Sequence, residues 1–298
     1  MRQKGIRLLS IFFILFLFNS FVYTEDAVSQ NHKNFLWKVQ SKTATVYLLG
    51  SIHFFKKEVY PLDKRIENAF DKSDILVVEA NIDDVSQIDL QKLIEGSLYP
   101  DNETLEEHVS KATYELVMKE VGELGIPPEF INKEKPWFLA LTLTSLELMK
   151  LGFDPTYGID MHFLSRAGKK KVLELESVDY QINLLSKFSD SDQELFLLYT
   201  LKDLNTMGHQ VDELTRAWTY GDTKSMESIM MKGAVADKKM NSIYEKLIYE
   251  RNRNMVSKIE EFLRTKETYF VVVGAGHLVG KKGIIEMLKG KGYPVEQL

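Results

Sequence analysis

The feature that most limits the possible folds is one strand pattern that occurs near both ends of this 298-residue chain. Residues 45–49 (TVYLL) lead into GSIH at 50–53, and residues 269–273 (YFVVV) lead into GAGH at 274–277. A third run, ILVV at 75–78, is equally apolar. Strands that are apolar on both sides are typical of a sheet covered by helices on both faces. The sequence therefore predicts a layered α/β fold.

The other elements follow from shorter patterns. Residues 35–40 and 45–50 predict a hairpin, because both are rich in β-branched and aromatic residues and are bounded by turn formers. Pro61 is expected to open a helix over 62–72, and each G-x-x-H turn is expected to lead into a helix. The remaining expected elements are helices over most of 86–150 and 178–265, a helix from Tyr157–Gly158, a strand within 169–177, and a last edge strand.

We therefore predict an α/β fold with a mixed central sheet built from the N- and C-terminal segments, covered by helices, with a large central helical insert. The sequence contains no repeat of 20–50 residues and no Gly/Ser-rich linker. Residues 25–298 are expected to form a single domain.

The first residues have the pattern of a targeting signal. Arg2, Lys4 and Arg7 precede an apolar run over 8–23, and a polar segment follows. The run is shorter than the roughly 20 apolar residues that span a bilayer, so we predict a signal peptide over about 1–24. The mature protein is then secreted or periplasmic. The alternative is a chain anchored in the membrane by an uncleaved leader, and no other membrane contact is expected.

Composition excludes several classes of protein. The chain has no cysteine, which excludes disulfide scaffolds, Cys-ligated zinc, iron–sulfur clusters, thiol catalysis and a lipid attachment site. The formal net charge is −5. Because a protein that holds a nucleic-acid backbone needs a strong basic excess, no nucleic-acid partner is expected.

Three chemically capable side chains follow the apolar strands. His53 and His277 end the two G-x-x-H turns, and Glu79 follows the third strand. Ligands of open α/β sheets bind beyond the carboxyl ends of the strands. Two imidazoles and a carboxylate there make a plausible set of ligands for a divalent cation. The plainer alternatives are histidines that cap turns and a Glu79 paired with a Lys or Arg.

The remaining motifs carry weaker signals. Arg251, in ERNRNM, belongs either to a solvated helix face or to a fixed guanidinium that binds an oxyanion or a substrate carboxylate. The sequence GAGHLVG does not match the dinucleotide fingerprint, because Gly280 comes one position late. His162 is expected to serve packing, although it can also approach a site. The three other histidines, His32, His108 and His209, are weaker candidates for site residues.

The chain resembles the TraB/PrgY/GumN family, whose animal relatives are the TIKI metalloproteases. The resemblance rests on five segments in family order: LLGSIHFFKKEVYPL, ILVVEAN, YGIDMHFLSRAGKKKVLELESVDYQ, ERNRNM and VVVGAGHLVGKKGIIEMLKGKGY. It covers roughly residues 35–298. It implies a fold like that of erythromycin esterase and the haem-binding ChaN protein. It also implies an active centre of His53, Glu79 and His277, with Arg251 and Asp160 as neighbours.

The leading functional hypothesis is therefore an extracytoplasmic metal-dependent hydrolase that cleaves peptides or proteins. His53, Glu79 and His277 would hold manganese, cobalt or zinc. If Glu79 is a metal ligand, the site has no obvious general base unless His162 or Glu176 lies close to the metal-bound water.

Two alternatives remain open. In the first, the hydrolase needs no metal: a histidine activates water directly and Glu79 tunes its basicity, as in enzymes that resemble erythromycin esterase. In the second, the chain is a non-catalytic protein that binds a peptide or haem. Its apolar cleft would then use aromatic residues of the helical insert: Trp137, Tyr157, Trp218 and Tyr220.

Overall fold

The structure is a computed structural model, and it describes residues 33–81 and 90–298. The predicted leader and His32 lie outside these residues. The strands are β1 Leu36–Gln40, β2 Thr45–Ser51, β3 Ile75–Val78, β4 Lys171–Glu174, β5 Thr268–Gly274 and β6 Val295–Gln297. The helices before β4 are α1 Lys64–Asp71, α2 Leu90–Ser97, α3 Leu105–His108, α4 Lys111–Glu123, α5 Pro136–Lys150 and α6 Ile159–Ser165, with short turns η1 Lys57–Val59, η3 Pro128–Phe130 and η4 Pro155–Tyr157.

A longer series of helices separates β4 from β5. They are α7 Val178–Ser186, α8 Asp190–Leu204, α9 Met207–Thr219, α10 Thr223–Ala236, α11 Met240–Tyr244, the π-helical turn η5 Glu245–Tyr249 and α12 Glu250–Phe262. Two short helices, α13 Ala275–Leu278 and α14 Ile284–Gly290, follow β5.

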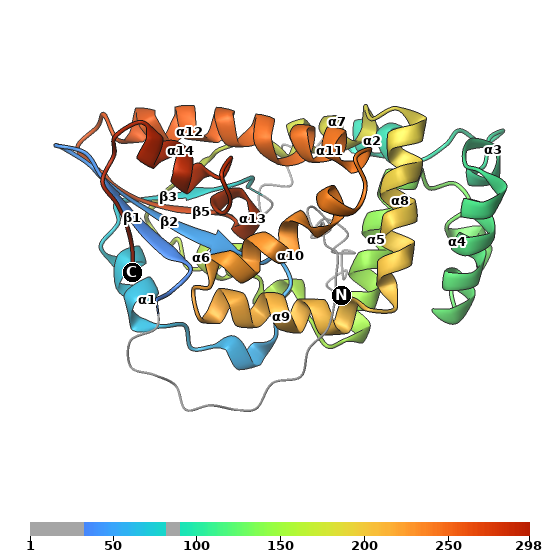
Figure 1. The fold of residues 1–298 in the computed structure, drawn as a ribbon, viewed down its shortest axis with the longest axis horizontal. Helices are drawn as coiled ribbons and strands as arrows, with labels where there is room; N and C mark the ends of the chain where they lie inside the picture. Colours follow the sequence, from blue (N-terminus) through green and yellow to red (C-terminus); the bar gives the residue numbers. More distant parts are fainter. Residues whose placement is uncertain (1–32, 82–89) are drawn as a thin grey trace, which may run out of the picture.

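The central sheet has the order β4-β3-β5-β2-β1-β6. Strands β4, β3, β5 and β2 are parallel, whereas β1 pairs antiparallel with β2 and with β6. The predicted mixed sheet from both chain ends and the predicted hairpin are confirmed. The strand β5 lies between β3 and β2, so the C-terminal segment completes a sheet that the N-terminal segment begins (Figure 1).

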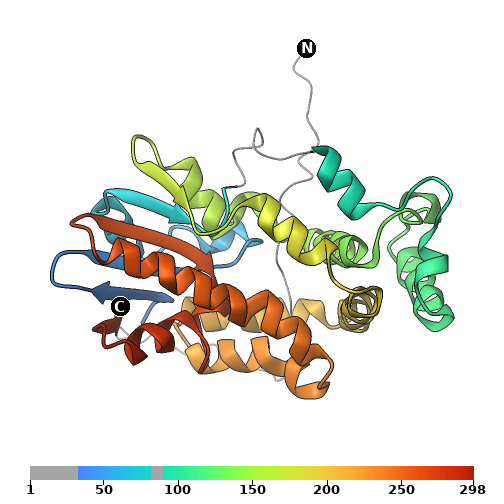
Figure 2. The same cartoon turned by 90° about the horizontal axis from the view of Figure 1, so that it is seen from above.

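Helices cover the sheet on both faces, as the apolar strands predict. On one face, Phe70 of α1 and Phe163 of α6 pack against Phe270 of β5. On the other face, Phe262 of α12 stacks on Tyr269 of β5. Side chains alternate along a strand, so these neighbouring β5 residues reach opposite layers. Figure 2 shows α12 running along its face of the sheet.

The central helices form a second hydrophobic cluster beside the sheet. Helices α5 and α8 pack against each other in this cluster, and α3 and α4 project away from the sheet (Figures 1 and 2). Trp137 of α5 is fully buried there. None of the helices in the part of the chain that the structure describes has the length and apolarity to cross a membrane.

Two local expectations were wrong. Helix α1 begins at Lys64 rather than directly after Pro61 at residue 62, because the Asp63 side chain accepts a hydrogen bond from the Arg65 backbone N–H and caps the helix. The first G-x-x-H turn is not followed directly by a helix. Instead, Phe55 pairs with Asp154 in an isolated bridge, which holds the chain extended before η1.

Candidate active site

The carboxyl ends of the four parallel strands supply the candidate site. His53 follows β2, Glu79 follows β3, Glu176 follows β4 and His277 follows β5. Because these strands are adjacent and parallel, their carboxyl ends lie at one edge of the sheet. The topology therefore brings the three predicted residues together, with Glu176 beside them.

Asp160 holds His53 in place. The His53 Nδ1 lies 2.8 Å from Asp160 Oδ1, and the Ser51 hydroxyl donates to the same carboxylate. Helix α6 carries Asp160 and is fixed to the loop by a hydrogen bond from the Ile159 N–H to the Ile52 carbonyl, 3.1 Å. Gly158 allows this contact, since a Cβ at this position would lie 2.3 Å from the His53 carbonyl oxygen. Residues 157–160, the YGID motif, thus fix the orientation of His53.

Asn252 fixes the tautomer of His277. The Asn252 Nδ2 donates to the Lys282 carbonyl (2.8 Å), so its Oδ1 faces His277 Nδ1 at 2.7 Å. An amide oxygen can only accept a hydrogen bond, and His277 Nδ1 is therefore the protonated nitrogen. In the neutral ring this tautomer leaves His277 Nε2 without a proton, 3.9 Å from Glu79 Oε1.

Glu79 belongs to a buried ionic network. Arg251 Nη2 donates to Glu79 and also to Glu176, 2.6 Å away, and Arg251 Nε donates to both Glu176 oxygens at 3.0 and 2.9 Å. Gln181 Nε2 donates to Glu79 Oε1 (3.0 Å), and the Gly274 N–H donates to Glu79 Oε2 (2.8 Å). Arg251 is 0% exposed. The helix face that carries it is therefore buried, and Arg251 pairs with the two carboxylates rather than with solvent.

The surroundings move the two histidine pKa values in opposite directions. Burial alone would lower the pKa of His53, but the Asp160 carboxylate and its hydrogen bond, together with Glu79, raise it to about 9. Burial and the Arg251 guanidinium lower the pKa of His277 to about 3. At neutral pH His53 is thus protonated and His277 is neutral. Opposite shifts within one site are characteristic of an acid–base pair.

The same network shifts the pKa values of the three buried carboxylates. Burial opposes ionisation of Glu79, but Arg251, His277 and His53 lower its pKa to about 2. Burial raises the pKa of Glu176, and the neighbouring Glu79 adds to this rise. Burial likewise opposes ionisation of Asp160, and the His53 imidazolium reverses the effect and lowers its pKa.

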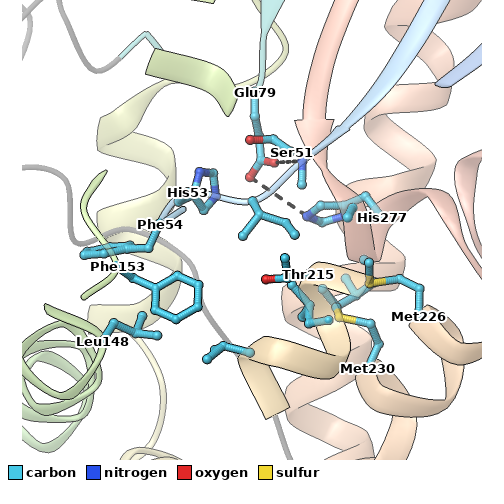
Figure 3. Close-up of a pocket in the computed structure, with 17 residues that line it drawn as sticks. Ser51, His53, Phe54, Glu79, Leu148, Phe153, Thr215, Met226, Met230 and His277 are labelled. Atoms are coloured by element: carbon cyan, nitrogen blue, oxygen red, sulfur yellow. Dashed lines mark hydrogen bonds and ion pairs between the residues drawn. The ribbon is translucent and has the colours of Figure 1, made fainter. Parts of the chain in front are cut away.

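A pocket opens beside these residues. It encloses about 740 Å³, including the part open to solvent, and His53, Glu79 and His277 all line it (Figure 3). The rest of the lining is largely apolar and comes from both hydrophobic clusters, with Leu214 from the sheet cluster and Leu148 from the helical cluster.

The predicted metal ligands do not form a metal-binding group in this arrangement. Among the described residues, no three His, Asp or Glu side chains converge as metal ligands. The donor types suit a divalent cation, and both Nδ1 atoms are held by oxygens, a common feature of ligating histidines. However, Glu79 already accepts hydrogen bonds from Arg251, Gln181 and Gly274. A cation at Glu79 would therefore lie beside a buried guanidinium, and the three-ligand set does not fit.

Other predicted residues lie outside the pocket. His162 contacts Glu67 (3.4 Å) and Arg166 (2.7 Å) at the contact between α6 and α1, and the structure does not bring it into the site. His108 is within 2.8 Å of Glu103, and His209 is 3.6 Å from Glu213. The four aromatic residues suggested for a binding cleft do not line the pocket. Two of them are core residues with hydrogen-bonded rings, Trp137 to the Gly96 carbonyl and Trp218 to the Gly50 carbonyl.

Sequence reasoning missed the residues that orient the site, chiefly Asn252, Ser51 and Gln181. A signal for Asn252 exists in the helical spacing. Arg251 and Asn252 precede Met255 and Val256 by four positions, so they share the apolar face of α12. Two polar residues in a buried stripe indicate a buried polar network. Ser51 and Gln181 have no comparable local signal.

The fold and the site together define an α/β protein with a histidine–carboxylate centre at the carboxyl ends of parallel strands. The chain belongs to the TraB/PrgY/gumN family, whose model matches residues 35–297. This confirms the family resemblance of the sequence motifs.

Related proteins agree with this assignment. YbaP of Escherichia coli (strain K12), described as uncharacterized, is 29% identical over 245 residues, which are 82% of this chain and 87% of YbaP. A metalloprotease TIKI homolog of Amphimedon queenslandica is 24% identical over 318 residues, 89% of this chain and 61% of that protein. Metalloprotease TIKI1 of Danio rerio is 22% identical, over 88% of this chain and 63% of that protein. No solved structure matches the chain significantly. The predicted likeness to erythromycin esterase and ChaN therefore stays a prediction.

Proposed function

We propose that this protein is a hydrolase that cleaves peptide bonds in peptides or proteins. The observation that carries the proposal is the pair of histidines in one pocket, with His53 oriented by Asp160 and His277 held in one tautomer by Asn252. The distant relatives named metalloproteases support a peptide or protein as substrate. The chain matches 61% and 63% of the length of these two relatives.

In the proposed mechanism, His277 acts as the general base. Its unprotonated Nε2 accepts a proton from a water molecule as the water oxygen attacks the scissile carbonyl carbon. Asn252 keeps the ring in the required tautomer through Nδ1. The nearby Glu79 carboxylate, 3.9 Å from Nε2, stabilises the imidazolium that forms.

His53 acts as the general acid. Its imidazolium, oriented by Asp160, donates a hydrogen bond to the developing oxyanion and then passes its proton to the leaving nitrogen. The carbon–nitrogen bond then breaks, and the products are a carboxylate and an amine. Exchange with solvent moves the proton from His277 and restores the proton on His53. Arg251 holds Glu79 in position and does not touch the substrate.

The test is hydrolysis of an unbiased peptide mixture by the purified protein, followed by mass spectrometry. We expect His277→Ala and His53→Ala each to lower turnover by about 100-fold or more, since general acid–base catalysis contributes 10²–10⁴-fold. The matched control is His162→Ala, a partly buried histidine outside the pocket, which should retain parental turnover. Equal turnover in the parent and both site variants contradicts the proposal.

The name of the relatives favours a second candidate, a metal-dependent hydrolase with manganese, cobalt or zinc. It requires Glu79 to exchange its Arg251 contact for the cation, which the present arrangement does not provide. Elemental analysis of the purified protein, with turnover measured before and after chelation, separates the two candidates. Turnover that survives complete metal removal favours the histidine pair alone.

We also propose that the protein acts outside the cytoplasm, either secreted or periplasmic. The support is the basic and apolar leader pattern of residues 1–24. Intact-mass analysis of the exported protein tests this, because removal of the leader leaves a new N-terminus near residue 25. A cytoplasmic protein with an intact leader contradicts it.

A further inference from the structure

The pocket continues from the histidines into an apolar region. Figure 3 shows Phe54, Leu148 and Phe153 on one side of it and Met226 and Met230 on the other, with His53 and His277 at the upper end. This apolar region lies directly beside the histidine pair. A substrate whose scissile bond lies between the histidines therefore places a neighbouring side chain in it.

The lining selects against charged side chains. Of the described residues that line the pocket, only His53, Glu79 and His277 are ionisable, and all three lie at the histidine end. A charged side chain in the apolar region would lose its hydration without gaining a partner. The two methionines add an adaptable wall, because their unbranched side chains fit apolar groups of different shape.

One polar group, the Thr215 hydroxyl, lies within this apolar lining. Thr215 is on α9, and its Oγ1 is buried and has no hydrogen-bond partner in the part of the chain that the structure describes. Other helical threonines, Thr219, Thr200 and Thr144, donate to the carbonyl four residues earlier. In Figure 3, the Thr215 oxygen points into the space between the two walls. A buried hydroxyl without a partner is costly, which points to a ligand group that pairs with it.

We propose that this region is a specificity subsite that takes an uncharged apolar side chain next to the scissile peptide bond, while the Thr215 hydroxyl donates a hydrogen bond to a main-chain carbonyl of the same substrate residue. The inference rests on the proposed hydrolase function and extends it to a substrate class. Thr215 is a binding residue in this proposal, and it takes no part in proton transfer.

The first test concerns Thr215. A peptide that the parent cleaves is used as substrate, and Thr215→Val removes the hydroxyl at nearly constant volume. We expect KM to rise roughly 3- to 10-fold at nearly unchanged kcat, the range that corresponds to one net hydrogen bond. Thr215→Ser retains the hydroxyl and should stay close to the parent. Equal KM values for the parent and Thr215→Val overturn the role of Thr215.

The second test concerns the side chain that enters the subsite. Peptides are compared that carry Leu or Lys beside the cleaved bond and are otherwise identical. We expect the parent to prefer the Leu peptide by at least 10-fold in kcat/KM, and Met230→Glu to reduce or reverse this preference. Met149→Glu is the matched control, because Met149 is 57% exposed and lies outside the pocket. A parent that cleaves both peptides equally overturns the subsite and leaves the hydrolase proposal standing.

A binding measurement separates failure of the subsite from failure of the hydrolase. Fluorescein-labelled Gly-Gly-Leu-Gly-Gly and Gly-Gly-Lys-Gly-Gly are titrated with the parent and with Thr215→Val. Preferential binding of the Leu peptide that weakens in Thr215→Val, with no hydrolysis of any peptide, supports the subsite and contradicts the hydrolase. Equal binding of both peptides contradicts the subsite.

Discussion

Arg251 is the residue on which the candidate site depends most. Its guanidinium is 0% exposed and joins Glu79, at the end of β3, to Glu176, just beyond β4. The fork of N–H donors on an arginine matches two carboxylates in a way that a lysine ammonium cannot. The pair of acidic side chains is therefore tolerated at the edge of the sheet because this one cation lies between them.

We expect Arg251→Met to destabilise the protein by about 3–5 kcal/mol, because the substitution leaves two buried carboxylates without a cation. Arg251→Lys should cost less, since it retains the charge and loses only the fork geometry. Denaturant unfolding at neutral pH measures both values.

The matched control is Arg253→Met on the same helix. Arg253 is half exposed and pairs with Glu245 at the surface, so its loss should cost no more than about 1 kcal/mol. An Arg251→Met variant as stable as Arg253→Met contradicts the structural role of the buried network.

The residues that bear the chemistry were predictable from the sequence, and so was the kind of partner of Glu79, a Lys or Arg, but not which residue it is. His53, Glu79 and His277 directly follow apolar strands, and strand ends in such sheets converge. The pairing of Asp160 with His53 spans 107 positions and that of Arg251 with Glu79 spans 172. Nothing in the local pattern encodes contacts at this separation, and only the family resemblance pointed to Asp160.

At the scale of elements, the placement of helix α6 decides the orientation of His53. Its first residues pack directly on the loop after β2, with the Ile159 N–H donating to Ile52. Gly158 makes the close approach possible, because a Cβ there would also lie 3.0 Å from the His53 carbonyl carbon. Any side chain at Gly158 must therefore push α6 and the His53 loop apart.

We expect Gly158→Ala to destabilise the protein by about 1–3 kcal/mol, the usual cost of overpacking, and to reduce turnover because Asp160 loses its hold on His53. Unfolding experiments and peptide hydrolysis measure the two effects.

Gly122→Ala in α4 is the control for Gly158→Ala. A Cβ added at Gly122 would meet no atom within 4 Å among the described residues, and replacing this helical glycine should leave stability unchanged or raise it by up to about 1 kcal/mol. Equal stability of the two variants contradicts the close packing of α6 against the His53 loop at Gly158.

The elements themselves were largely predictable because their signals are local. Apolar runs identified β2, β3 and β5, and helical periodicity identified the central helices. The order of the strands was not predictable, because the insertion of β5 between β3 and β2 depends on pairing between distant segments. The start of α1 was mistaken because the Asp63 cap outweighs the proline signal at Pro61.

For the whole molecule, the main feature is the position of the pocket between two hydrophobic clusters. Met226 and Leu214 belong to the sheet cluster, whereas Phe54, Leu148 and Phe153 belong to the helical cluster. The chemical groups follow the strands of the sheet, and one wall of the apolar region comes from residues of the helical cluster. In the proposed function, the shape of the substrate pocket would therefore depend on the way in which the helical cluster packs against the sheet.

The helical part also contains a buried acid that links stability to pH. Glu134 lies just before α5, and its Oε2 is buried without a hydrogen-bond partner among the described residues. Burial raises its pKa from 4.5 to about 7, although a hydrogen bond with Thr142 opposes the rise. The folded protein therefore holds this proton more tightly than the unfolded chain does.

The sign of the effect follows from this difference. Below pH 4.5 the carboxyl of Glu134 is protonated in both states and contributes no pH dependence. As the pH rises towards 7, the unfolded chain releases the proton first, so the free energy of unfolding falls by about 1–3 kcal/mol and then levels off.

We expect Glu134→Gln to remove this loss of stability: the variant should match the parent at pH 4 and exceed it in stability at pH 8. Denaturant unfolding across this pH range measures the difference, with Glu129→Gln on the neighbouring exposed turn as control. A Glu134→Gln variant whose advantage does not grow with pH contradicts the assignment, because the burial of an ionised carboxylate is the only cost that the substitution removes selectively above pH 7.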